Sequence, residues 1–120
     1  MLAKGLKIID LINGSGAVAE VGDVVLYHFD CHLPHGDLLH SSRESDPIQS
    51  EVGSRDLCVG ISQGLIGMIE NGKRSIKVPP QLSHIERKIW GHLSDNVVLR
   101  YEVELLKVIK KNFDKPKETI

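Results

Sequence analysis

Alternation of apolar and polar residues near the end of the chain constrains the fold more than any other feature. Apolar side chains occupy every second position from Val97 to Leu105 in NVVLRYEVELLKV, residues 96–108, and Arg100, Glu102 and Glu104 lie between them. A period of two places successive side chains on opposite faces of a strand. The segment is therefore predicted to be a long strand with one buried face, which further strands or a helix must cover.

Three other segments are predicted to be strands: KGLKIIDLI (4–12), DVVLYHFDCHL (23–33) and GKRSIKVPP (72–80). DLLHSSRESDPI (37–48) is less regular and is predicted to be a strand followed by a loop. LCVGISQGLIGM (57–68) carries no charge and contains glycines at steps of four and three, which favours a short helix held close to its neighbours. The pattern predicts an α+β fold, a mainly antiparallel sheet with one short helix.

Length and composition narrow the class of protein further. A chain of 120 residues is long enough for one domain, and we expect it to cover residues 1–108, with 109–120 as a charged tail or linker. A net charge of −1 does not favour a nucleic-acid partner, and no apolar run is long enough to cross a membrane. The N-terminus does not resemble a secretory signal, and the chain has two cysteines, so a reducing cytoplasm is expected.

Four segments in this order resemble the FKBP-type peptidyl-prolyl isomerase family: GDVVLYHF, GDLLHSSRESDP, GLIGMIENGKRSIKVPPQL and NVVLRYEVELL. The resemblance covers about residues 5–108. It implies a curved five- to six-stranded antiparallel sheet wrapped around one short α-helix, with a proline-binding pocket between them. It also implies an isomerase that assists protein folding, acts on proline-containing polypeptides, and can bind macrolide ligands.

The chemistry of this family needs no nucleophile, metal or cofactor. The X-Pro amide has partial double-bond character, and rotation about it must cross a barrier of roughly 18–20 kcal/mol. In the transition state the amide is twisted and less polar, so a dry apolar pocket favours it over the planar ground state. Large apolar side chains around the proline ring are therefore the main requirement.

The resemblance implies a set of pocket residues, several of which depart from the aromatic pattern of the family. Ile61 stands where the family has a tryptophan, His84 where it has a tyrosine, and Leu39 and His40 where it has phenylalanine and aspartate. Trp90 lies in a loop expected at 85–96, and it is the one further ring that could close the pocket. The full set is Phe29, Leu39, His40, Ile48, Leu57, Cys58, Ile61, His84, Trp90, Leu93 and Tyr101.

Two readings of these departures stay open. In the first, the chain is an isomerase with reduced activity, since aliphatic side chains still remove water from an amide. In the second, it is a non-catalytic FKBP-like module that binds a protein partner. An open apolar cavity formed by Phe29, Leu57, Ile61, Trp90 and Tyr101 would favour the first. A cavity filled by His40, His84 or the loop would favour the second.

A third hypothesis is metal binding by CHLPHGDLLH, which contains Cys31, His32, His35 and His40, with His28 shortly before. The residue types suit zinc or nickel. The strand geometry does not, because Cys31 and His32 point to opposite faces, and only a pair that includes His35 across the turn remains open. Scattered histidines without a metal are the favoured interpretation. If His40 and His84 both face the pocket, their titration would make binding pH-dependent.

Overall fold

The computed structural model describes residues 4–54, 58–91, 93 and 96–111. The strands are β1 (Lys7–Ile12), β2 (Val24–His32), β3 (Leu38–Ser41), β4 (Ile48–Glu51), β5 (Lys73–Val78) and β6 (Leu99–Ile109). The helices are α1 (Val59–Gly64), a 3₁₀ turn η1 (Pro80–Leu82) and α2 (His84–Trp90). None of the described helices is long and apolar enough to cross a membrane.

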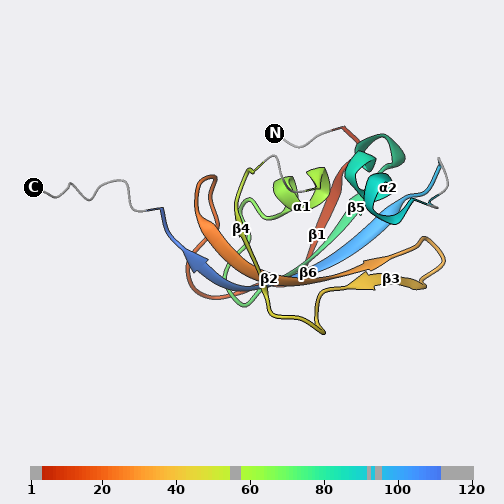
Figure 1. The fold of residues 1–120 in the computed structure, drawn as a ribbon. Coiled ribbons are helices and arrows are strands. Elements are labelled where there is room, and N and C mark those ends of the chain that lie inside the picture. The colour runs from red at the N-terminus through yellow and green to blue at the C-terminus, as the bar shows by residue number, and fades with distance from the viewer. Residues whose placement is uncertain (1–3, 55–57, 92, 94–95, 112–120) are drawn as a thin grey trace, which may run out of the picture.

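All six strands belong to one antiparallel sheet, in the order β1-β5-β6-β2-β3. β4 pairs with the first half of β2, and β3 with the second half, so these two short strands share one edge of β2. The sheet curves around α1, and both α-helices lie on its concave side (Figure 1). The predicted α+β class and the curved antiparallel sheet around a short helix are confirmed.

The core lies between the concave face of the sheet and α1. Leu99, Tyr101, Val103 and Leu105 of β6 are fully buried, as the alternation predicts. A bulge opposite β2 then shifts the register, so that Val108 is the next buried residue of the strand. The bulge adds one residue to β6, so the buried position after it comes one residue later than regular alternation predicts.

Two glycines allow α1 to lie directly on β5. A Cβ atom at Gly60 would be 2.3 Å from Val78 Cγ2, and one at Gly64 would be 2.2 Å from Ile76 Cδ1. Arg74 of β5 then holds the end of the helix by donating from Nη1 to the carbonyl oxygens of Gly64 and Ile66, at 3.0 and 2.8 Å. The spacing of these two glycines in the sequence therefore reflects the close packing of α1 on β5.

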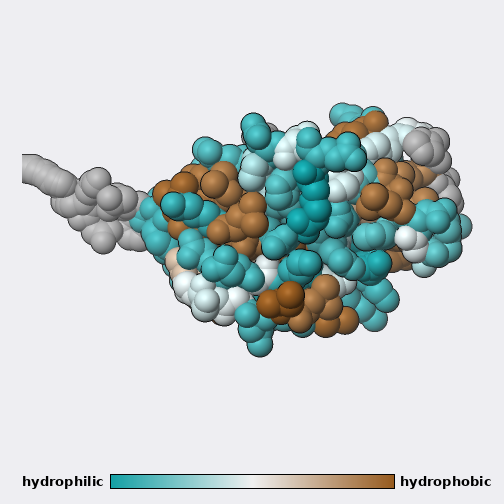
Figure 2. Space-filling view, turned by 90° about the horizontal axis from the view of Figure 1, so that it is seen from below, coloured by the Kyte–Doolittle hydropathy of each residue, from teal (hydrophilic) through white to brown (hydrophobic). Residues whose placement is uncertain are grey.

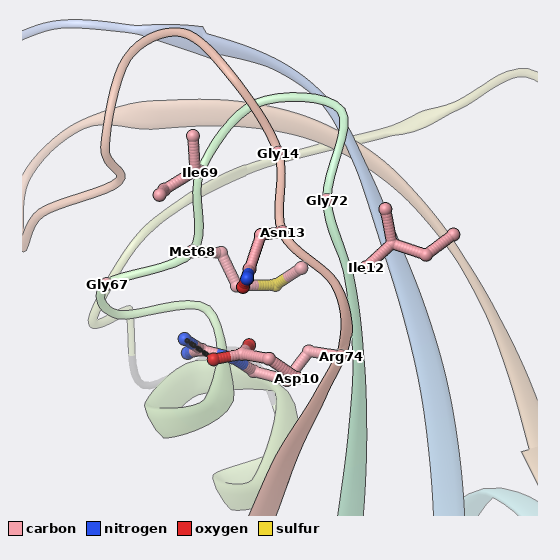
Figure 3. Close-up of a pocket in the computed structure, with 9 residues that line it drawn as sticks. All are labelled: Asp10, Ile12, Asn13, Gly14, Gly67, Met68, Ile69, Gly72 and Arg74. Carbon is pink, nitrogen blue, oxygen red and sulfur yellow. Dashed lines mark hydrogen bonds and ion pairs between the residues drawn. The ribbon is translucent and has the colours of Figure 1, made fainter.

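A small hollow lies beside this contact, between the turn after β1 and the turn before β5 (Figure 3). Arg74 Nε donates to Asp10 Oδ1 at 2.7 Å on one side of it. Its volume is about 30 Å³, about enough for one water molecule. The hollow and its ion pair therefore belong to the packing of β1 on β5.

α2 occupies a segment that was expected to be a loop. It begins directly after η1 and ends at Gly91, whose φ of 60° is favourable for glycine. Ile85 and Ile89 are one helical turn apart, and so are Glu86 and Trp90. Glu86 is fully buried, and Ile85 and Trp90 are partly buried, so this side of the helix faces the sheet, while Ile89 stays exposed at its edge.

The chain beyond the expected boundary at residue 108 is attached to the domain. Ile109 is the last residue of β6, and the Lys110 ammonium donates to Asp23 Oδ2 at 2.6 Å. Asp23 Oδ2 also accepts from the Glu20 N–H, and Oδ1 accepts from the Lys111 N–H. Residues 112–120 of the expected tail lie outside the described residues.

These contacts predict a pH dependence of stability. Burial acts to raise the pKa of Asp23, but the Lys110 ammonium and the two backbone donors outweigh it and hold the pKa below the ordinary value of 3.8. Because the native pKa is the lower one, ionised Asp23 stabilises the fold above about pH 4, and this contribution is lost as the pH falls through the native value.

Asp23→Asn should lower the free energy of unfolding at pH 7 by about 1–3 kcal/mol, since Asp23 makes three charge-assisted hydrogen bonds. The difference from the unmodified protein should shrink below about pH 4. Urea unfolding at a series of pH values measures both curves. A difference that stays constant down to about pH 2 would show that the charge of Asp23 has no part in it.

Candidate functional site

An open apolar cavity of about 320 Å³ lies on the concave side of the sheet, between α1, α2 and the middle of β2. Its walls come from six separate elements and from Cys58, the residue before α1. The lining residues are Tyr27, Phe29, His40, Ile48, Cys58, Ile61, Ile85, Ile89, Trp90 and Tyr101. We call this space the concave pocket.

A chain of four rings runs along one wall of the concave pocket. Tyr101 meets Phe29 edge to face, with ring centroids 5.4 Å apart. Phe29 lies 5.7 Å from His40, and His40 lies 5.7 Å from Trp90. Trp90 therefore supplies a large ring at the mouth, while Ile61, which replaces the family's tryptophan, lies buried below. Contacts of this kind give a rigid apolar wall.

A buried polar cluster lies behind this wall. The Tyr101 hydroxyl donates to Glu86 Oε2 at 2.7 Å, and neither residue is exposed to solvent. Burial raises the pKa of Tyr101, with further contributions from Cys58, Cys31 and Glu86, so the phenol stays protonated and remains a donor. Glu86 Oε1 has no hydrogen-bond partner among the described residues.

Both cysteines lie next to this cluster as free thiols. Burial, followed by the effect of Glu86, raises the pKa of Cys58 to about 12. Burial also raises the pKa of Cys31 to about 12. A thiol that stays protonated is a poor nucleophile. The concave pocket thus combines apolar walls with a thiol unsuited to covalent chemistry.

The structure brings seven of the eleven predicted site residues together in the concave pocket: Phe29, His40, Ile48, Cys58, Ile61, Trp90 and Tyr101. Leu39 and Leu93 line a second apolar cavity instead, together with Leu33, Pro34 and Val97. Leu57 lies outside the described residues.

His84 is placed differently from the expectation. It is the first residue of α2, it is exposed, and it does not line the concave pocket. Ile85 and Ile89 of the same helix line the pocket instead, although Ile89 remains 62% exposed. Without His84 in the pocket, the condition for a joint pH effect of the two histidines is not met.

Three lining residues were missed: Tyr27, Ile85 and Ile89. Tyr27 shares its strand face with Phe29, so the period of two contains that signal. The i, i+4 spacing of the two isoleucines in HIERKIW is a helical signal that could have predicted both them and α2.

The histidines considered for metal binding are dispersed. His40 lies opposite Cys31 and faces the concave pocket, His35 Nε2 is 2.9 Å from Asp37 Oδ2, and His28 Nδ1 is 2.9 Å from Ser42 Oγ. Among the residues described, no group of three or more His, Cys, Asp or Glu side chains is placed to hold a metal ion.

Comparison with known proteins agrees with this geometry. A family model described as FKBP-type peptidyl-prolyl cis-trans isomerase matches residues 16–106. The crystal structure of AtFKBP13 superposes with a TM-score of 0.72 at 25% identity, covering 86% of this chain and 92% of that one. FkpA from Escherichia coli has a TM-score of 0.69 at 22% identity, covering 91% of this chain and 51% of that one, which shows similarity of fold.

Among relatives by sequence, FK506-binding protein 2 of Candida glabrata is 34% identical, covering 74% of this chain and 67% of its own length. Peptidyl-prolyl cis-trans isomerase FKBP16-1 of Arabidopsis thaliana, a chloroplastic protein, is 29% identical over 90% of this chain. The chain spans 60% of the length of FKBP16-1 and 15% of mouse FKBP10, to which it is 35% identical over 73% of its residues.

The expected cytoplasmic location is contradicted by the chloroplastic relative. The expectation rested on the small number of cysteines. Few cysteines argue against a disulfide framework, but they do not distinguish among compartments in which thiols stay reduced. Composition therefore could not decide the location.

Proposed function

The chain belongs to the FKBP-type peptidyl-prolyl cis-trans isomerase family, and from this premise we propose that it isomerises X-Pro bonds in polypeptides and thereby assists protein folding. The observation that carries the proposal is the open concave pocket of about 320 Å³, in which Phe29, Trp90 and Tyr101 retain rings around an apolar space. The histidine at its edge, His40, is exposed and leaves the space open.

The proposed mechanism depends on removal of water and on shape. The proline ring enters between Phe29, Ile61 and Trp90, and its amide leaves water for apolar surroundings. There the planar amide loses hydration, while the twisted, less polar transition state loses less. The N–H of Cys58, next to the pocket, is proposed to hold a substrate carbonyl during rotation. No step forms a covalent bond to the protein.

We further propose that the rate is lower than in a pocket with a complete set of rings. Ile61 presents less surface than an indole, and a fully buried aromatic side chain contributes on the order of 150–250 Å². The same apolar walls should bind macrolides weakly. Trp90 offsets part of the loss, because its ring joins the wall from α2.

The test is an isomerisation assay on an Ala-Leu-Pro-Phe-type peptide, by protease coupling or by NMR exchange, with a macrolide titration alongside. We expect a rate above that of buffer, and a higher rate for Ile61→Trp, whose larger side chain would enter the adjoining cavity. A folded protein with the rate of buffer alone would reject the enzyme and favour a binding module. A folded Ile61→Trp protein without any gain would place the limitation elsewhere.

A further inference from the structure

A line of positive charge crosses the face of the sheet that points away from the helices. Lys7 of β1 lies directly opposite Lys77 of β5, and Lys77 lies opposite Arg100 of β6. Directly opposed residues of antiparallel strands project from the same face. We call these three residues the cationic row. Strands lie about 4.8 Å apart, so the row extends over roughly 10 Å.

The row faces the convex side because its neighbours along the strands face inward. Val78 packs on α1 at Gly60, and Leu99 is fully buried, so Lys77 and Arg100, one residue away on each strand, point to the opposite face. Figure 2 views the molecule from this side, where hydrophilic residues cross the surface between apolar patches.

Most charges on the convex face are neutralised within the chain. Arg43 pairs with Asp30 at 3.2 Å and with Glu104 at 2.7 Å, and Arg100 pairs with Glu102. Lys7 and Lys77 are exposed, and neither has an ion-pair partner among the described residues. Two like charges placed directly opposite each other destabilise a sheet. A carboxylate supplied from outside the chain would relieve that repulsion.

An apolar cavity adjoins the same cations. It has a volume of about 390 Å³, and it is lined by Lys77 and Arg100 together with Leu33, Pro34 and Val98. Two aliphatic side chains are exposed in this region: Val98 is 37% exposed, and Leu38 of β3, which pairs with His32 of β2, is 56% exposed. Cationic and aliphatic side chains therefore line the same cavity, which fits a ligand that combines negative charge with an aliphatic group.

We propose that the cationic row and this cavity form a docking surface for an acidic polypeptide segment, with one of its aliphatic side chains inserted in the cavity. Lys7 and Lys77 have no ion-pair partner among the described residues and lie one strand spacing apart, while Arg100 already shares its charge with Glu102. Cations set in a line instead of converging on a point match separate carboxylates along a chain better than a single phosphate. Among the described residues that line the cavity, none has an aromatic ring on which a nucleic-acid base could stack. The surface is separate from the concave pocket.

The probe is a fluorescein-labelled peptide of about eight residues, glutamates with one central leucine, titrated with the whole chain and followed by fluorescence anisotropy. Lys7→Glu combined with Lys77→Glu should weaken binding about tenfold or more, and Lys77→Gln should weaken it less. Replacing the central leucine of the probe by glycine should cost about tenfold in affinity. Amide shifts in ¹⁵N spectra should concentrate in β1, β5 and β6.

Lys88→Glu is the matched control, because this exposed lysine lies on α2, on the other side of the sheet. It makes the same change in net charge as Lys77→Glu alone, which is half the change of the double variant. Lys77→Glu alone should weaken binding, and Lys88→Glu should leave it within about twofold. Equal weakening by Lys88→Glu, or shifts confined to the concave pocket, would overturn the proposal. The proposal would also be overturned if the chain bound an RNA oligonucleotide or anionic vesicles but not the peptide, and if that binding were lost when Lys7 and Lys77 are both replaced by Glu.

Discussion

Replacing Trp90 by alanine is expected to lower kcat/KM for a proline-containing peptide about thirtyfold. Trp90 lines the mouth of the concave pocket and continues the row of rings through His40. Burying a large apolar side chain contributes about 1.5–3 kcal/mol, and each 1.4 kcal/mol of transition-state stabilisation corresponds to about tenfold in rate. Because Trp90 is only half-buried in the free protein, its removal should affect the rate more than the stability.

Trp90→Phe is the matched control, since it keeps a ring at the same position. It should restore kcat/KM to within about threefold of the unmodified protein. Urea unfolding of both variants separates a loss of fold from a loss of binding surface. If the folded Trp90→Ala protein retains its kcat/KM within about threefold, then Trp90 packs beside the substrate without contacting it.

The second large effect is expected from Tyr101→Phe, which removes only a hydroxyl. Glu86 is fully buried, and the Tyr101 hydroxyl is the donor to its Oε2. Without that donor a buried carboxyl would lose its hydrogen bond, which destabilises proteins by roughly 2–4 kcal/mol. For a domain of this size the melting temperature should fall by roughly 10 °C. Thermal and urea unfolding measure the change.

A double-mutant cycle tests whether the loss comes from the pair. Tyr101→Phe should be far less harmful in a Glu86→Leu background, with a coupling energy of about 2 kcal/mol. Tyr27→Phe is the control, because Tyr27 is also buried, on the neighbouring strand, and no carboxylate among the described residues accepts a hydrogen bond from its hydroxyl. It should destabilise by about 1 kcal/mol. Equal losses for the two tyrosines would remove any special role for the carboxyl.

The long strands β1, β2, β5 and β6 were predictable because alternation leaves a direct trace in the sequence, whereas the short β4 (Ile48–Glu51) was not predicted. The buried face of β6 follows the pattern from Leu99 to Leu105, and its interruption at a bulge could not be read from residue types. The resemblance placed Phe29 and Ile61 at the pocket, where the structure also has them. Both lie on regular elements, whose geometry converts sequence spacing directly into position.

The resemblance placed His84 at the pocket and a loop directly after it, whereas in the structure His84 is the first residue of α2 and does not line the pocket. Successive residues of a helix turn by about 100°, so a shift of one position exchanges His84 for Ile85 at the pocket. The same helix buries Glu86, a residue type that is almost never fully buried without a partner. Its partner, Tyr101, lies 15 residues away on β6, and nothing local in the sequence connects the two.

Local spacing in the sequence was sufficient to predict the antiparallel sheet and the short glycine-rich helix, and the resemblance to the FKBP-type family implied the pocket. The folded chain was needed to show which rings meet, that Trp90 joins the pocket wall, and that Lys7, Lys77 and Arg100 form one row. Contacts between distant segments depend on strand order and register, and a shift of one residue would move every side chain to the other face. The pocket and the cationic row are therefore properties of the folded sheet.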